Sequence, residues 1–142
     1  MPASRSAFSA AVLTGIAILT GYIQAEQLAA AALLREVGVP ERAHAVVGRR
    51  LRHGGKLPGF LSVPIENLNG ERRAGALLDL TRAAYRDGAA VVDSVIEAVR
   101  YAANAKPGMG FALAALEVAG RLPEGAGLGL LALGRSAAWL RP

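Results

Sequence analysis

The sequence contains no cysteine and only two histidines, His44 and His53, in 142 residues. The lack of cysteine excludes a disulfide scaffold, a Cys-ligated zinc site, an iron–sulfur cluster and a cysteine nucleophile. Two histidines are also too few for a His-rich metal site, so we expect no bound metal. Aromatic residues make up only 5% of the chain. This scarcity disfavours strands, which are enriched in aromatic and β-branched residues.

Residues that form helices are abundant instead. Alanine (30) and leucine (20) together account for 50 of the 142 residues, and both have a high helix propensity. We therefore expect an all-α fold. The length is about that of one domain and is sufficient to bury a hydrophobic core.

Fourteen arginines and two lysines give the chain a formal net charge of +5. The one dense basic cluster consists of Arg49, Arg50, Arg52, His53 and Lys56. Sites for single-stranded nucleic acid typically combine such residues with aromatic side chains, and no aromatic residue lies within this cluster. We therefore expect a solvated helix end or a site for an anionic small molecule, and not a nucleic-acid interface.

Residues 7–25 contain no charged side chain. A stretch of this length is compatible with a signal peptide or a short membrane span. Glycine and threonine dilute its hydrophobicity, however, and only Arg5 precedes it. We expect a buried core helix in a cytoplasmic protein without a membrane partner, with the signal or membrane segment as the alternative.

Glycine and proline divide the chain into seven expected helices. They cover residues 6–19, 25–37, 40–52, 71–86, 89–103, 109–121 and 126–140. The first is expected to stop at Gly21 and the fourth at Asp87 and Gly88. Residues 54–70 form a long loop, and loops of this length are usually functional. No strand pattern is present. A spacing of three and four residues predicts that one helix face packs in the core, formed by Val92, Val95, Ile96 and Val99.

Four stretches, in this order along the chain, resemble segments of citrate synthase. Residues 6–21 are similar to the helix before the family's Gly-Pro-Leu-His-Gly-Gly motif. Residues 55–60, Gly-Lys-Leu-Pro-Gly-Phe, are similar to its Lys-Ile-Pro-Gly-Phe-Gly-His loop. Residues 71–78 resemble its Asp-Pro-Arg-Ala motif and the helix that follows. Finally, residues 111–139 resemble its Val-Asp-Phe-Ala-Leu-Ala-Ala-Leu stretch and its last long helix.

This resemblance implies a citrate-synthase-like, multi-helical all-α fold. Residues 1–22 would form a helix of the large domain, residues 23–112 essentially the small domain, and residues 113–142 the helices that return to the large domain. The chain covers less than half of the family's length and lacks the counterpart of its N-terminal half. We therefore expect a homo-oligomer, or a second chain that supplies the missing half.

The resemblance also locates the family's three catalytic groups, none of which is retained. Gln24 and Ser62 stand where the family has its two histidines, and Gly110 stands where it has an aspartate. The condensation needs a carboxylate that removes the α-proton of acetyl-CoA, and donors for the enolate and ketone oxygens. We therefore expect ordinary citrate synthesis to be absent.

Two binding features of the family remain. Arg72 and Arg73 match the arginine that contacts the substrate carboxylates, with the register between the two open. Lys56, Leu57 and Gly59 match the loop that approaches coenzyme A. The resemblance thus implies coenzyme A, an acyl-CoA or a polycarboxylate as a ligand, and no covalently bound cofactor.

Three hypotheses on function remain open. The first is a non-catalytic or altered acyl-CoA- or polycarboxylate-binding protein or subunit. The second is a divergent acyl-CoA condensing or lyase-type enzyme, completed by a second chain, in which Gln24, Ser62, Glu26 or His53 takes a new role. Glu26 is otherwise expected to stabilise the dipole at a helix N-terminus. The third is a helical interaction module or a decayed gene fragment.

Overall fold

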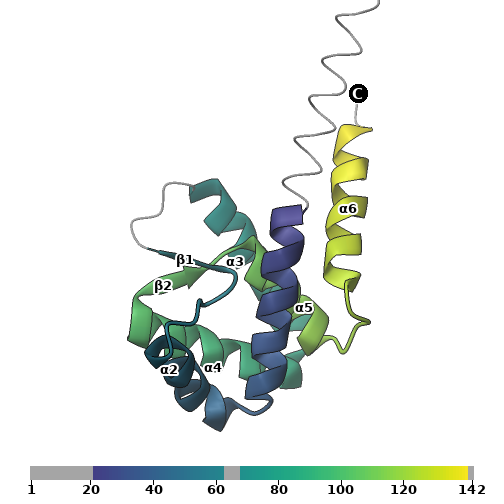
Figure 1. The fold of residues 1–142 in the computed structure, drawn as a ribbon. Coiled ribbons are helices and arrows are strands. Elements are labelled where there is room, and N and C mark those ends of the chain that lie inside the picture. Colours follow the sequence, from purple (N-terminus) through teal and green to yellow (C-terminus); the bar gives the residue numbers. More distant parts are fainter. Residues whose placement is uncertain (1–20, 63–67, 141–142) are drawn as a thin grey trace, which may run out of the picture.

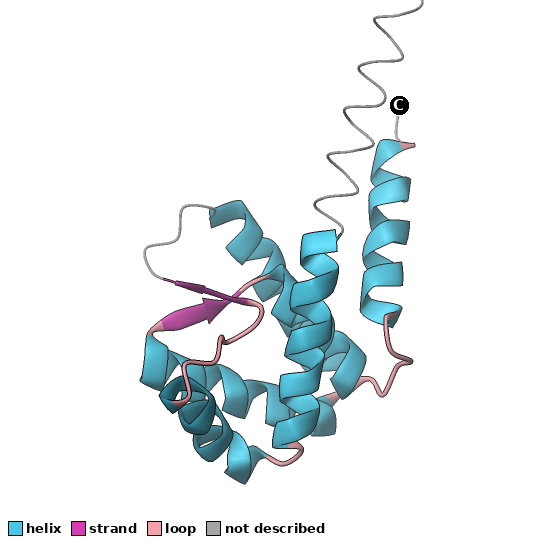
Figure 2. Ribbon diagram, in the orientation of Figure 1, coloured by secondary structure: helices cyan, strands magenta, loops and turns pink. Residues whose placement is uncertain are grey.

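The computed structural model describes residues 21–62 and 68–140, which are mostly helical (Figures 1 and 2). The all-α class is thereby confirmed for these residues, whereas a citrate-synthase-like arrangement and the division at residues 22 and 112 stay predictions. A helix over residues 21–37 comes first. The elements that follow are η1 (Pro40–Arg42), α2 (Ala43–Arg52), β1 (Phe60–Ser62), α3 (Leu68–Ala84), α4 (Arg86–Ala103), β2 (Ala105–Pro107), α5 (Met109–Ala119) and α6 (Ala126–Trp139).

The helix over residues 21–37 corrects the predicted stop at Gly21, since Gly21 is itself helical. Its C-terminal end agrees with the prediction. Gly38 has a φ of 70° and its N–H donates to the Leu34 carbonyl at 3.0 Å, a left-handed cap that favours glycine. The expected helix over residues 6–19, and most of the uncharged stretch over residues 7–25, lie outside the described residues. None of the helices in the described ranges is both long and apolar enough to cross a membrane.

The break between α3 and α4 lies at Tyr85, and not at Asp87 and Gly88 as predicted. Tyr85 leaves the helical region with φ −135° and ψ 67°, and α4 begins at the next residue. Asp87 therefore lies in the first turn of α4, where a carboxylate favours the helix dipole. A Cβ on Gly88 would lie 2.5 Å from the carbonyl oxygen of Ala119. The glycine thus permits close contact with α5 and does not end a helix.

A two-stranded antiparallel sheet corrects the expectation that no strand is present. β1 pairs with β2, and Leu61 lies opposite Lys106. Each strand is three residues long and lies in a stretch that the sequence indicates as loop or turn. The pairing joins segments about 45 residues apart, so no local pattern reveals it. It anchors the loop after α2 to the start of α5.

The hydrophobic core surrounds α5, which contacts α3, α4, α6 and β2. Residues 110–115 of α5 are all buried, and the Phe111 side chain has no exposed surface. The small residues of this helix let its neighbours approach closely. The predicted stripe on α4 is confirmed as core, since Val92, Val95 and Val99 are buried and Ile96 packs against them.

A buried carboxylate connects α6 to the rest of the chain. Glu117 of α5 has no exposed surface. Its Oε2 accepts hydrogen bonds from Gln27 Nε2 at 2.6 Å, from the Gly125 N–H at 3.0 Å and from the Gly127 N–H at 3.3 Å. Its Oε1 accepts one from Arg35 at 3.0 Å. From this attachment α6 extends away from the helical body (Figure 1).

Candidate functional site

Three segments meet beside the N-terminal end of α5. They are the helix over residues 21–37, the loop before β1, and residues 108–111. The N–H of Gly108 donates to the Gly59 carbonyl at 2.7 Å. Gly59 has a φ of 80°, and a Cβ placed on it would lie 2.6 Å from the backbone nitrogen of Phe111. This contact requires glycine for both its conformation and its lack of a side chain.

Glu26 completes this junction from the neighbouring helix. Its carboxylate accepts a hydrogen bond from the Gly59 N–H at 2.5 Å. A Cβ on Gly110 would lie 2.9 Å from the Glu26 Cβ. The glutamate therefore occupies the space that a side chain at position 110 would need. Its predicted place at a helix N-terminus is wrong, because the helix already includes residues 21–25.

Two adjoining cavities open at this junction. The smaller, which we call the glycine cavity, has a volume of about 210 Å³ and is lined by Ile23, Gly59, Leu61, Gly108, Met109 and Gly110, among others. The larger, which we call the basic cavity, has a volume of about 550 Å³ and includes Arg50, Leu51, Lys56, Leu57, Pro58 and Ser62. Tyr22, Glu26 and Phe60 line both cavities. Glu26 thus lies between an apolar cavity and one with cationic walls.

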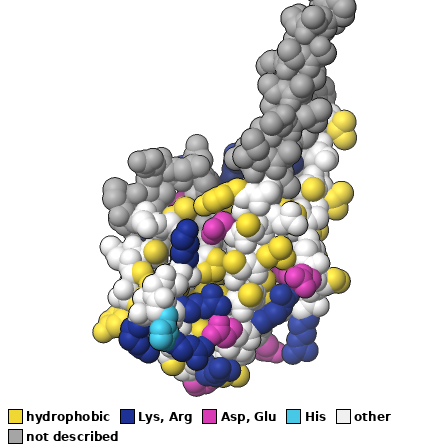
Figure 3. Space-filling view, in the orientation of Figure 1, with side chains coloured by type: hydrophobic (Ala, Val, Ile, Leu, Met, Phe, Trp, Pro, Cys, Tyr) yellow, Lys and Arg dark blue, Asp and Glu magenta, His cyan; other side chains and the backbone are white. Residues whose placement is uncertain are grey.

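The cationic side of the basic cavity comes from the end of α2 and the loop that follows. Arg50 donates to Glu36 Oε2 from Nε at 3.0 Å and from Nη2 at 2.5 Å. Arg49 also binds Glu36. The hydrogen bond from Arg50, and then that from Arg49, lower the pKa of Glu36 below its usual value. Lys56 is exposed on the loop. On the face shown in Figure 3, Lys and Arg side chains gather over the lower half of the molecule.

The structure brings some of the predicted site residues together. Lys56, Leu57 and Ser62 line the basic cavity, and Gly59 and Gly110 line the glycine cavity. These residues come from stretches of sequence that lie about 50 residues apart. The loop after α2, which the sequence predicts to be functional, therefore supplies residues to both cavities.

Other predicted residues lie elsewhere. Gln24 is exposed and lines neither cavity. It is two residues from both Tyr22 and Glu26, which corresponds to about 200° around the helix axis, so it points to the opposite side. Arg72 and Arg73 are exposed on α3 and also line neither cavity.

His53, the other candidate for a new catalytic role, is exposed at the C-terminal cap of α2 and lines neither cavity. Within the described ranges, no three His, Asp or Glu side chains are placed so that they could hold a metal ion.

Sequence reasoning missed Tyr22 and Met109 and gave Glu26 only a secondary role. Tyr22 and Glu26 are four residues apart, the spacing of neighbours on one helix face. That spacing was the available signal for them. Met109 carried no signal, because only the pairing of β1 with β2 brings the start of α5 next to the loop.

No protein-family profile matches the chain, and no curated protein is significantly similar to it. The resemblance to citrate synthase is therefore a prediction that depends on the short stretches of sequence alone.

Proposed function

We propose that this chain is a citrate-synthase-like protein that binds an acyl-CoA non-catalytically in the basic and glycine cavities. The observation that carries the proposal is the position of Lys56 and Leu57. These residues, assigned to coenzyme A by the resemblance, line one cavity together with Arg50, and Gly59 lines the cavity beside it.

The chemistry of the two cavities fits the two ends of such a ligand. Lys56 and Arg50 attract the phosphates of coenzyme A, because phosphate is a preferred partner of lysine and arginine. The apolar side chains of Ile23, Leu61 and Met109 suit an acyl group. The basic cavity also falls in the range of about 300–1,000 Å³ that is typical of small-molecule sites.

The same arrangement argues against ordinary citrate synthesis. Ser62 is a poor acid, and Gln24 lies outside both cavities. Arg72 and Arg73, which the resemblance assigns to the substrate carboxylates, are likewise outside them. We therefore favour an acyl-CoA over a polycarboxylate as the ligand.

Calorimetric titration of the full chain with acetyl-CoA and butyryl-CoA tests this proposal. We expect saturable binding, weakened about three- to tenfold by Lys56→Ala through loss of one charged phosphate contact. Lys106→Ala is the matched control, because Lys106 is also exposed but pairs with Glu71 at 2.8 Å and lines neither cavity. Absence of binding, or equal effects of the two variants, would overturn the proposal. Release of the CoA thiol with acetyl-CoA and oxaloacetate would refute its non-catalytic part.

One observation favours a second candidate, a divergent acyl-CoA enzyme. The side chain of Glu26, which carries a carboxylate, packs against Gly110. Position 110 is where the resemblance places the family's catalytic aspartate. Glu26 would then remove the α-proton of a bound acyl thioester. Exchange of the α-protons of acetyl-CoA in deuterated water measures this step. Glu26→Gln keeps an acceptor for the Gly59 N–H and should abolish the exchange. If wild-type protein produces no exchange, this candidate is excluded.

The proposed protein associates with a further chain in the cytoplasm, either a second copy or one resembling the family's missing half. Three exposed leucines support this part of the proposal: two lie in α6 and the third is its C-terminal cap. Their side chains have large exposed fractions: Leu130 47%, Leu133 68% and Leu140 83%. Apolar surface of this kind favours association.

A further inference from the structure

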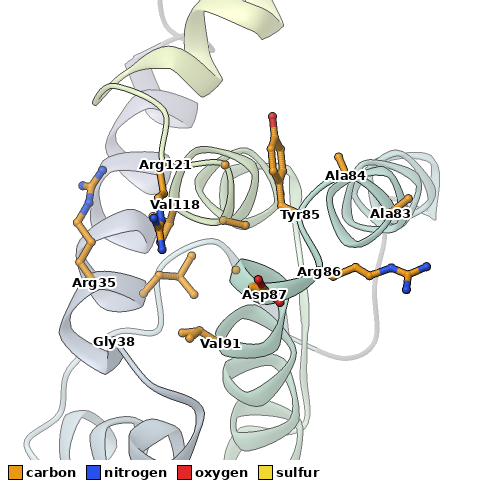
Figure 4. A pocket seen from close by; sticks show the side chains of 14 residues that line it. Arg35, Gly38, Ala83, Ala84, Tyr85, Arg86, Asp87, Val91, Val118 and Arg121 are labelled. Carbon is orange, nitrogen blue, oxygen red and sulfur yellow. The ribbon is translucent and has the colours of Figure 1, made fainter.

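A third cavity lies at the other end of the helix over residues 21–37, where that helix, α4 and α5 come together (Figure 4). Its volume is about 870 Å³, and it shares no lining residue with the basic or the glycine cavity. We call it the arginine groove. The lining residues that matter here are Arg35, Arg86, Asp87, Val91, Val118 and Arg121.

Arg121 holds a backbone conformation that normally belongs to glycine. After α5 ends, the Leu122 N–H donates to the Glu117 carbonyl at 2.9 Å and the Arg121 N–H donates to the Val118 carbonyl at 3.2 Å. These two bonds form a Schellman motif, whose left-handed position is usually glycine. Arg121 occupies that position with a φ of 51°. A strained residue of this kind is an observation from which a functional role can be inferred.

The guanidinium of Arg121 points into the groove on the side where Arg35 lies (Figure 4). Among the described residues, Arg121 forms no ion pair. Arg35 has 45% of its side chain exposed and uses one amino group to bind Glu117. Asp87, in the first turn of α4, is the one acid among the groove's lining residues. Arg86 points away from the groove (Figure 4). Arg121 is thus a cation of the groove that has no ion pair in the described part of the chain, whereas Arg35 is paired with Glu117 and Asp87 supplies one negative charge.

From these observations we propose that the arginine groove is a second ligand site, which binds a small molecule bearing a carboxylate or a phosphate. The guanidinium of Arg121 forms a two-pronged contact with the anionic group, and Arg35 adds a second positive charge. Val91 and Val118 receive the apolar part of the ligand. The chain keeps arginine at a position that favours glycine because the side chain binds the anion.

The test uses the full chain and three probes, inorganic phosphate, phenyl phosphate and benzoate, each titrated by calorimetry and by NMR. Saturable binding of phenyl phosphate or benzoate is expected, and their relative affinities identify the preferred anion. Arg121→Gly should weaken the better probe about tenfold or more through loss of the charged contact. The same substitution should raise Tm, because it relieves the left-handed strain.

Arg86→Ala is the matched control, since Arg86 lines the same groove but points away, and it should change the affinity less than twofold. Lys56→Ala should leave unchanged the part of the binding that Arg121→Gly removes, which separates this site from the proposed acyl-CoA site. The proposal is overturned if none of the probes binds saturably, or if Arg121→Gly binds as tightly as wild type. It is also overturned if Arg121→Gly lowers Tm, because arginine would then stabilise the turn.

Discussion

At the scale of single residues, the site depends on positions where a side chain is absent. Gly59 and Gly110 let the loop and the helix over residues 21–37 reach the start of α5, and Glu26 occupies the space beside Gly110. A side chain at position 110 would collide with Glu26. Glu26 and Gly110 therefore depend on each other in the packing of this junction.

The first prediction separates the two reasons for glycine at position 59. Gly54 also has a positive φ, of 68°, but a Cβ there would meet no atom within 4 Å. Gly54→Ala should lower the free energy of unfolding by about 1 kcal/mol, from backbone strain alone. Gly59→Ala should lower the free energy of unfolding by roughly 1–3 kcal/mol more, because the added Cβ meets backbone atoms of Phe111. Urea unfolding of the two variants measures the difference, and equal losses would show that the contact is not tight.

The second prediction concerns Glu36, whose pKa Arg50 and Arg49 lower from its usual value of 4.5. A group with a lowered pKa in the folded state stabilises the protein above its unfolded pKa, and the stabilisation is lost as pH falls. The free energy of unfolding should therefore decrease below about pH 4.5. The decrease should be smaller in Glu36→Gln.

Urea unfolding at several pH values between 3 and 6, a window of about three units around that pKa, makes this comparison. Glu41→Gln is the control, since Glu41 is an exposed acid in the neighbouring η1. If Glu36→Gln and wild type have the same pH dependence, the two arginines do not stabilise the ionised Glu36.

At the scale of elements, α6 is held mainly at its first turn. Glu117 accepts hydrogen bonds from the N–H groups of Gly125 and Gly127, which have no partner within the helix. A Cβ on Gly127 would also lie 2.8 Å from the Leu113 carbonyl oxygen. Attachment of α6 therefore depends on one carboxylate and one close backbone contact.

Glu117→Gln should loosen this attachment, because the amide places an NH2 group where donors already converge. We expect the free energy of unfolding to fall by roughly 1.5–3 kcal/mol, the contribution of hydrogen bonds to a buried charged group. Hydrogen exchange of residues 125–133 should accelerate more than that of α4. Glu124→Gln, at an exposed acid in the turn before α6, should leave exchange unchanged. Equal protection in wild type and Glu117→Gln would mean that other contacts hold α6.

At the scale of the whole molecule, an apolar surface continues along α6 beyond its attachment. Leu133 is 68% exposed there. Because burial of apolar surface stabilises association, this surface should set the oligomeric state of the chain.

Leu133→Lys should therefore shift the chain toward monomer in light scattering at high protein concentration. Leu80→Lys is a closely matched control, since Leu80 on α3 is 67% exposed and lies outside α6. A wild-type chain that is monomeric at every concentration would contradict this prediction, as would equal effects of the two substitutions.

Much of the fold could be predicted from sequence, with errors at particular places. The ends at Gly38 and Arg52 and the apolar stripe of α4 follow from local signals, and they are observed. The expected helix end at Gly88 is wrong, because a glycine in a tight helix contact looks the same in sequence as one in a turn. Part of the candidate site could also be predicted, since Lys56, Leu57, Gly59 and Ser62 line the two cavities.

The sequence by itself determined the helical class and most helix boundaries, because helix formation depends on residues within a few positions of one another. Only the tertiary structure decided which distant segments of the chain lie next to one another. It paired β1 with β2, placed Glu26 against Gly59 and Gly110, turned Gln24 away from both cavities, and brought Arg121 near Arg35. These contacts join residues that are distant in the chain, and they depend on which helix faces pack together, so no local pattern contains them.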